Sequence, residues 1–444
     1  MNESSTRGSN LLHDLILPTI LFAALGGMTW AVRGCSGYGA VNGCVFAGVT
    51  WGAAWWFIAR DPGAKQSRRY ASAWIILALA VGIGLAGGRG LMQLSSFFRG
   101  ELLLDASTNK VVPISRAYGF LWLFIAGVPW AGLGACMLAW TGARRDDGAS
   151  SARIAGDWAL RIACGVGAVL IANRLFAAYP EIFLPLYKSM KAQYADLAAN
   201  PNLRRLIGDN RLAIGHLGLY LGFLFAEVVR RDWKNVTLIT TVGILNGAGW
   251  ALCQNWAWAK SVFPGVNFNF WRCWESSGGI SIGIAYGVAY YLVNRPDAGT
   301  PRRTPSPNLQ RFGVYFGLLF GLGYSVKNGL KGWANIYIGN EAYWSRLLSL
   351  IIFPTVLLCL AVLAIRIATR PLPRNYEGDP IPEAAWLVWV TLIIQNVLAQ
   401  LVTGPHSNWT ENAFCLYYAV LFLVSGAIVY HYQVRQRDGI ARLK

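Results

Sequence analysis

The chain has 444 residues, of which 55% are hydrophobic and only 14% are charged. Soluble proteins carry about 25% charged residues, so the composition excludes an ordinary soluble protein and indicates a polytopic integral membrane protein. The formal net charge of +18 raises the alternative of nucleic acid binding, but the positions of the basic residues argue against it.

Apolar stretches long enough to cross a bilayer predict an all-α fold with about twelve transmembrane helices. In chain order they cover residues 12–32, 37–59, 71–91, 117–140, 157–176, 212–230, 235–253, 274–293, 312–333, 346–366, 384–403 and 412–431. The first stretch is too long for the hydrophobic part of a signal peptide, so we assign it as the first span. No polar stretch is long enough to bury a core of its own, and we expect no separate soluble domain.

The connections on one side of the predicted spans are basic and mostly short. With the N-terminus in the cytoplasm, the inner connections contain Arg60, Lys65, Arg68, Arg69, Arg144, Arg145, Arg153, Arg230, Arg231, Lys234, Arg295, Arg302, Arg303, Arg311, Arg366, Arg370 and Arg374. This excess is the positive-inside pattern. We therefore predict a plasma or bacterial inner membrane protein with both termini in the cytoplasm, and no nucleic acid partner.

The second half of the chain repeats the first in five places, in the same order. The matched segments are 26–32 with 246–252, 43–60 with 278–295, 82–91 with 321–330, Pro129 with Pro354, and 171–175 with 394–398. Six spans separate the copies, so both copies start on the same side of the membrane. Such parallel repeats are related by an axis along the membrane normal.

The repeat predicts two six-helix halves. We expect a cytoplasmic tail at residues 1–10, a first half at 11–230, a cytoplasmic connection at 231–234, a second half at 235–432 and a cytoplasmic tail at 433–444.

Twelve spans, cytoplasmic ends and a parallel six-plus-six repeat resemble the major facilitator superfamily of secondary transporters. That family has a G-x-x-x-D-R-x-G-R-R motif between spans 2 and 3, where this chain has RDPGAKQSRR at 60–69, echoed by RPDAGTPRR at 295–303. The Asp–Arg order is reversed here, and only RRDWK joins spans 6 and 7. The resemblance implies alternating access around a site between the two halves, and it implies no particular substrate.

Two charged residues occur where the first and eighth spans reach the outer face. Glu275 aligns with Ala40 in the repeat, so the carboxylate is an addition to one half. A charge at membrane depth is costly and usually faces a partner or a water-filled cavity, and Arg33 is the candidate partner. Two interpretations stay open: an ion pair that joins the two halves, or a ligand group or proton carrier.

A second group of charges is expected near the outer ends of spans 3 and 9. Arg89 aligns with the residue after Lys327, and Arg99, Glu101 and Lys331 lie just beyond. A basic cluster there would attract an anionic group. Solvated or snorkelling side chains are the alternative.

Closer to the midplane the polar residues are uncharged. Asn246 and Asn396 suit either interhelical hydrogen bonds or contacts with a solute, and Trp130 lies beside the helix bend expected at Pro129.

Glycines at four-residue spacing predict close helix packing. Gly279, Gly283 and Gly287 share one face of the eighth span, and Gly48 and Gly52 repeat the spacing in the second.

Several other chemistries lack support in the sequence. The four histidines, His13, His216, His406 and His431, lack metal-ligand spacing, and no Walker loop occurs, so we expect no metal and no cofactor. A Cys253–Cys273 disulfide is left open for an oxidising outer compartment.

These patterns favour a secondary transporter of a small polar solute, such as a sugar, a sugar acid or an organic anion, over an enzyme. The expected solute-binding residues are Arg33, Arg89, Glu275 and Lys327 at the outer mouth and Asn246, Asn396 and Trp130 nearer the midplane. The expected partners are the solute and the lipid bilayer, with partner membrane subunits left open.

The alternative is a membrane-embedded enzyme or complex subunit with an active or binding site at the outer face, because the charges gather there. A transporter should continue a polar path to the cytoplasmic side, whereas an enzyme or scaffold should be sealed below the outer pocket.

Overall fold

The computed structural model describes residues 11–35, 40–60, 68–87, 94–142, 151–295, 306–373, 376, 379–402 and 409–441. Most of these residues are helical, which confirms the all-α fold class. The sequence analysis did not anticipate an antiparallel hairpin of β1 (Glu101–Asp105) and β2 (Lys110–Pro113), in which Leu102 pairs with Val112.

A helix lies at each of the ranges expected to span. These helices are α1 (Leu17–Cys35) after the π-helical turn η1 (Leu12–Ile16), α2 (Ala40–Ala59), α3 (Ile75–Leu85), α5 (Ala117–Thr141), α6 (Ser151–Ala178), α9 (Pro201–Val229), α10 (Trp233–Leu252), α12 (Phe270–Val293), α13 (Pro307–Tyr337), α14 (Glu341–Thr369), α15 (Ala384–Leu401) and α16 (Trp409–Ala441). Shorter elements in the connections are α4 (Leu94–Arg99), α7 (Pro180–Phe183), α8 (Lys191–Ala195), η2 (Cys253–Trp258) and α11 (Ala259–Val262).

Eight of the described helices are long and apolar enough to cross a membrane. They cover Leu12–Gly34, Val41–Ala59, Ala117–Thr141, Ala152–Ala178, Pro201–Val229, Glu341–Thr369, Ala384–Leu401 and Trp409–Gly439. Helix α14 has no buried residue, and Leu350 and Leu357 on it are each 66% exposed. Soluble proteins rarely expose apolar surface on this scale, whereas hydrocarbon tolerates it, so these helices support insertion into a membrane.

Helices α1 and α12 touch backbone to backbone at the centre of the molecule. A Cβ atom added at Gly279 would lie 2.0 Å from the carbonyl oxygen of Gly26, and one added at Gly283 would lie 2.2 Å from that of Phe22. No side chain fits at these crossing points, so glycine lets the two helices approach as closely as the four-residue spacing predicts.

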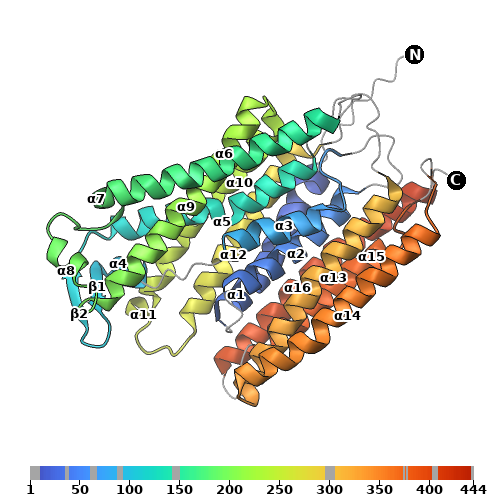
Figure 1. Ribbon diagram of the computed structural model, residues 1–444. Helices are drawn as coiled ribbons and strands as arrows, with labels where there is room; N and C mark the ends of the chain where they lie inside the picture. Colours follow the sequence, from blue (N-terminus) through green and yellow to red (C-terminus); the bar gives the residue numbers. More distant parts are fainter. Residues whose placement is uncertain are drawn as a thin grey trace.

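The remaining helices surround this pair. Helix α10 packs against α5, α2 against α3, and α6 against α9, while α13 lies beside α14 and α2. In Figure 1 the blue helices α1–α3 and the yellow α12 lie between a green group, α6 and α9, and an orange-red group, α13–α16. The two predicted halves therefore meet chiefly where α1 contacts α12 and where α5 contacts α10.

The bundle has two distinct ends. At the termini end, η1 meets α16, where His13 Nδ1 lies 3.4 Å from His431 Nε2. The opposite, hairpin end carries β1, β2, α8 and α11 (Figure 1). Helix α1 runs from the termini end toward the hairpin end, so its last residues lie at the hairpin end of the bundle.

The α1–α12 contact predicts a clear difference between two glycines. Gly279→Ala should lower the thermal unfolding midpoint, because the new methyl group forces the two backbones apart at a cost of about 1–3 kcal/mol. Gly167→Ala on α6 is the matched control, since a Cβ there meets nothing within 4 Å and alanine favours the helix. Equal midpoints for the two variants in detergent would contradict the described crossing.

Candidate functional site

Arg33 and Glu275 form a buried ion pair between α1 and α12. Arg33 Nη1 donates to Glu275 Oε2 at 3.0 Å, and the two side chains are 7% and 5% exposed. A Cβ atom at Gly34 would lie 2.2 Å from the carboxyl carbon of Glu275, so glycine there leaves room for the carboxylate. The glycine crossing thus brings together the two charges that the sequence analysis paired.

Tryptophans enclose this ion pair. The guanidinium carbon of Arg33 lies 4.9 Å from the ring centre of Trp30 and 5.1 Å from that of Trp130, within the range of a cation–π contact. Trp250 lies 5.0 Å from Trp130, and Trp274 stacks on Trp250 at 5.3 Å. We call Arg33, Glu275, Trp30, Trp130, Trp250 and Trp274 the Arg33 cluster.

Two predicted midplane residues, Trp130 within the Arg33 cluster and Asn246 beside it, hold helices together. Trp130 Nε1 donates to the carbonyl oxygen of Ala86 at 2.9 Å. Asn246 Nδ2 donates to the carbonyl oxygen of Gly127 at 2.6 Å, and Asn246 is fully buried one helical turn from Trp250. Both side chains therefore have structural partners, and Asn246 fixes α10 against α5.

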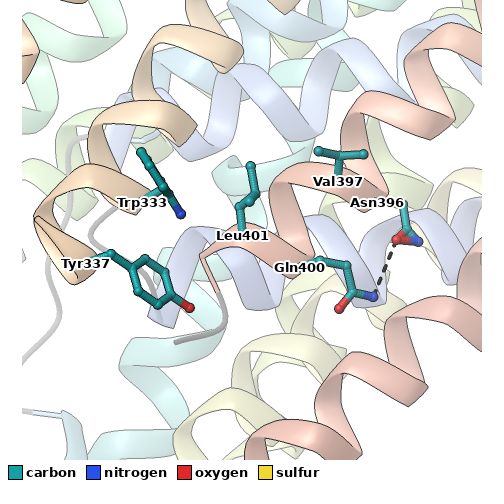
Figure 2. A pocket seen from close by; sticks show the side chains of 6 residues that line it. All are labelled: Trp333, Tyr337, Asn396, Val397, Gln400 and Leu401. Carbon is teal, nitrogen blue, oxygen red and sulfur yellow. Dashed lines mark hydrogen bonds between the residues drawn. The ribbon is translucent and has the colours of Figure 1, made fainter. Parts of the chain in front are cut away.

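Asn396 lies elsewhere, in a groove between α13 and α15. The groove has a volume of about 380 Å³ and is lined by Trp333, Tyr337, Asn396, Val397, Gln400 and Leu401. Figure 2 shows the aromatic side chains on one side and the amides on the other, with Gln400 Nε2 donating to Asn396 Oδ1 at 3.4 Å. An aromatic face opposite amide groups suits a sugar ring or a similar polar solute.

The expected basic cluster near the outer mouth stays a prediction, and its described members have other partners. Lys327 Nζ donates to Ser345 Oγ at 3.4 Å, at the contact of α13 with α14. Arg99 instead pairs with Glu101 at 3.0 Å beside the hairpin. Arg89 lies outside the described residues.

Two further side-chain features occur near the head of α12. Arg272 Nη1 donates to Glu411 Oε2 at 2.7 Å, which ties the head of α12 to α16. Cys253 and Cys273 are both free thiols.

A second, smaller cluster of the same residue types lies near the termini end. Arg161 Nε donates to Glu227 Oε1 at 2.6 Å, and the two side chains are 2% and 0% exposed. The guanidinium carbon of Arg161 lies 5.4 Å from the ring centre of Trp140 and 5.6 Å from that of Trp158. We call these four residues the Arg161 cluster. Like Arg33, Arg161 pairs with one glutamate and lies against two tryptophans.

Hydrogen bonds extend the Arg161 cluster to α10. Glu227 Oε2 accepts from Arg230 Nη1 at 2.7 Å and from Asn235 Nδ2 at 2.8 Å. Arg69 pairs with Asp232, which also caps α10. Charged side chains therefore fix the short connection between the predicted halves, residues 231–234: Glu227 and Arg230 lie just before it, and Arg69 pairs with Asp232 within it.

The arginines assigned to membrane topology have a second role. Arg68 Nη2 donates to Asp14 Oδ1 at 2.8 Å, and Arg60 pairs with Asp379. These side chains are largely buried, so the positive-inside pattern describes where they are in the sequence but not what they bind.

The sequence analysis missed the Arg161 cluster, although a signal for it was present. Arg161 falls in the predicted span 157–176 and Glu227 in 212–230. The rule that singled out Glu275, that a charge inside a span needs a partner, applies equally to both residues.

Comparison of the chain with protein-family models, with curated proteins and with solved structures finds no significant match. The class of protein therefore rests on the molecule itself: its described residues form an all-α fold with eight helices long and apolar enough to cross a membrane, and they contain two buried Arg–Glu–Trp clusters.

A double-mutant cycle tests whether the Arg33 cluster is a coupled unit. Glu275→Gln and Arg33→Met should each lower the free energy of unfolding by about 3–5 kcal/mol, because each leaves a buried partner unpaired. The double variant should be destabilised by clearly less than the sum of the two. Additive losses in denaturant unfolding would show that the two side chains do not interact.

The Arg161 cluster predicts a similar sensitivity at the termini end. Glu227→Gln should be strongly destabilising, since it leaves the buried Arg161 without its counter-charge and leaves Arg230 with Asp157 alone. Arg99→Gln breaks an exposed pair, with side chains 55% and 37% exposed, and should change stability by less than about 1 kcal/mol. If both variants unfold at the same denaturant concentration, the predicted importance of the buried Glu227 is wrong.

Proposed function

We propose that this protein is a secondary transporter of a small polar solute, and that the described conformation is a closed state. It would lie in a plasma or inner membrane with its termini end in the cytoplasm and its hairpin end outside. Twelve helices in two six-helix halves would cross the bilayer, as in the major facilitator superfamily, which the sequence resembles.

One observation carries the proposal: the Arg33 and Arg161 clusters lie at two depths along the same helix. Trp130 of the first and Trp140 of the second are ten residues apart on α5, which is about 15 Å along the helix axis. This spacing is about half the thickness of the hydrocarbon core, so the two matched clusters would give a solute charged and aromatic contacts at two successive depths on its way through.

The contacts between the two predicted halves support alternating access. At the hairpin end the halves are joined by Arg33 with Glu275. At the termini end they are joined by Glu227 with Asn235 and, through the connection, by Arg69 with Asp232. Opening toward either side breaks charged contacts on that side only, so the two openings are separate events.

The groove at Asn396 is a second place for the solute on its way in. Its volume of about 380 Å³ falls within the range of small-molecule sites. Its aromatic and amide lining suits the sugar-like end of the proposed substrate range.

The alternative is a membrane-embedded enzyme or complex subunit with a site at the outer face. It is favoured by the aromatic side chains packed beside the Arg33 cluster. There Trp51, whose ring centre is 6.1 Å from that of Trp30, and Tyr286 are almost fully buried with ring centres 5.7 Å apart. A static aromatic core would seal the molecule below an outer site.

Ligand screening followed by uptake separates the two functions. Sugars, sugar acids and carboxylates should be screened for a rise in the unfolding midpoint, and the solute that binds should then enter proteoliposomes. Glu275→Gln should lose both responses, because Glu275 holds Arg33 in place.

Glu341→Gln is the matched control, since Glu341 is 51% exposed where it pairs with Lys331 at 2.7 Å. It should keep binding and uptake. Binding without uptake in the unmodified protein would move the assignment to the enzyme or complex subunit.

A further inference from the structure

Four buried N–H groups of the Arg33 cluster have no hydrogen-bond acceptor in the part of the chain that the structure describes. They are Nε1 of Trp30, Trp250 and Trp274 and Nε of Arg33. The residues that carry them are 0–7% exposed, so bulk water does not satisfy these donors in the closed conformation.

The lack of acceptors is not a general property of the tryptophans in this region. Trp51 Nε1 donates to the carbonyl oxygen of Phe22 at 2.8 Å, and Trp130 Nε1 donates to that of Ala86 at 2.9 Å. The fold thus gives an acceptor to Trp51 beside the cluster and to Trp130 within it, but to none of the other three tryptophans of the cluster. Buried donors are nearly always paired in native proteins, and an unpaired one costs free energy.

We propose that the Arg33 cluster is the binding site for a small anion, a halide or a carboxylate, which accepts hydrogen bonds from these N–H groups. The inference rests on the proposed function, in which the Arg33 cluster receives the solute, and narrows the solute or its companion ion to an anion.

The chemistry of the cluster selects an acceptor over a donor. Indole and guanidinium groups donate hydrogen bonds and accept none, and the edge of an aromatic ring carries partial positive charge. The carboxylate of Glu275 is already paired with Arg33 at 3.0 Å, so its charge is balanced.

A cation finds no corresponding place. The ring faces that would attract it are those of Trp30 and Trp130, and the guanidinium of Arg33 already lies against both, at 4.9 and 5.1 Å. A neutral sugar needs acceptors for its hydroxyl protons, which the four N–H groups do not provide.

Burial limits how the anion enters. Both side chains of the Arg33–Glu275 pair are less than a tenth exposed, so the site opens only when α1 and α12 separate at the hairpin end. The anion then completes the hydrogen bonds that the closed protein leaves unmade.

Quenching of tryptophan fluorescence tests the site directly. The purified full chain in halide-free detergent buffer should be titrated with bromide, a heavy-atom quencher. A bound anion gives a saturable component on top of the linear collisional quenching of exposed tryptophans, and chloride, formate or acetate should displace it.

Two variants and a control make the result specific. Trp274→Phe removes one donor and Arg33→Lys replaces the guanidinium while keeping the charge. Each should weaken the saturable component at least tenfold, and circular dichroism shows whether each is folded. Trp386→Phe is the control, since Trp386 is 73% exposed, and should leave the saturable component unchanged.

The outcomes separate this inference from the proposed function. Purely linear quenching in the unmodified protein overturns the anion site, even if another solute is transported. Saturable quenching without uptake of any solute supports the anion site and rejects the transporter. Displacement by carboxylates alone identifies the anion as the solute, whereas displacement by chloride alone identifies it as a companion ion.

Discussion

The backbone contact of α1 with α12 is the constraint on which the rest of the structure depends. It places Gly26 against Gly279 with no room for a side chain, and so sets the distance between Arg33 and Glu275. Burying two charges is costly unless their geometry is good. The glycine crossing, together with Gly34 beside the carboxylate, supplies that geometry.

Helix α5 links this contact to the other end of the molecule. Trp130 packs against Arg33 near its middle, and Trp140 packs against Arg161 near its end. Because α5 also packs along α10, with Asn246 bonded to Gly127, a movement of α10 relative to α5 changes the surroundings of both clusters. Helix α5 is thus the one element that supplies a tryptophan to each of the two clusters.

Much of the fold could be predicted from the sequence, because hydropathy marks apolar helices and glycine spacing marks close contacts. The Arg33–Glu275 pair was predictable for the same reason, since a charge at membrane depth needs a partner. The neighbours of Lys327 and the groove at Asn396 could not be predicted, because they depend on which face of α13 meets α14 and α15. The ion pairs of Arg68 and Arg69 were not predicted, because the positive-inside rule counts basic residues and does not assign partners to them.

Stability alone does not account for the two buried Arg–Glu pairs. Replacing such a pair by well-packed apolar side chains is often neutral or stabilising, and a static membrane scaffold would lose nothing by that exchange. Arg33 with Glu275 lies where the two predicted halves meet, and Glu227 of the second pair bonds across to Asn235. Ionic contacts at such positions can separate and find water or a ligand, whereas an apolar contact would resist opening. Ion pairs at these two positions, beside the middle of α5 and beside its end, are therefore what the proposed change of conformation requires.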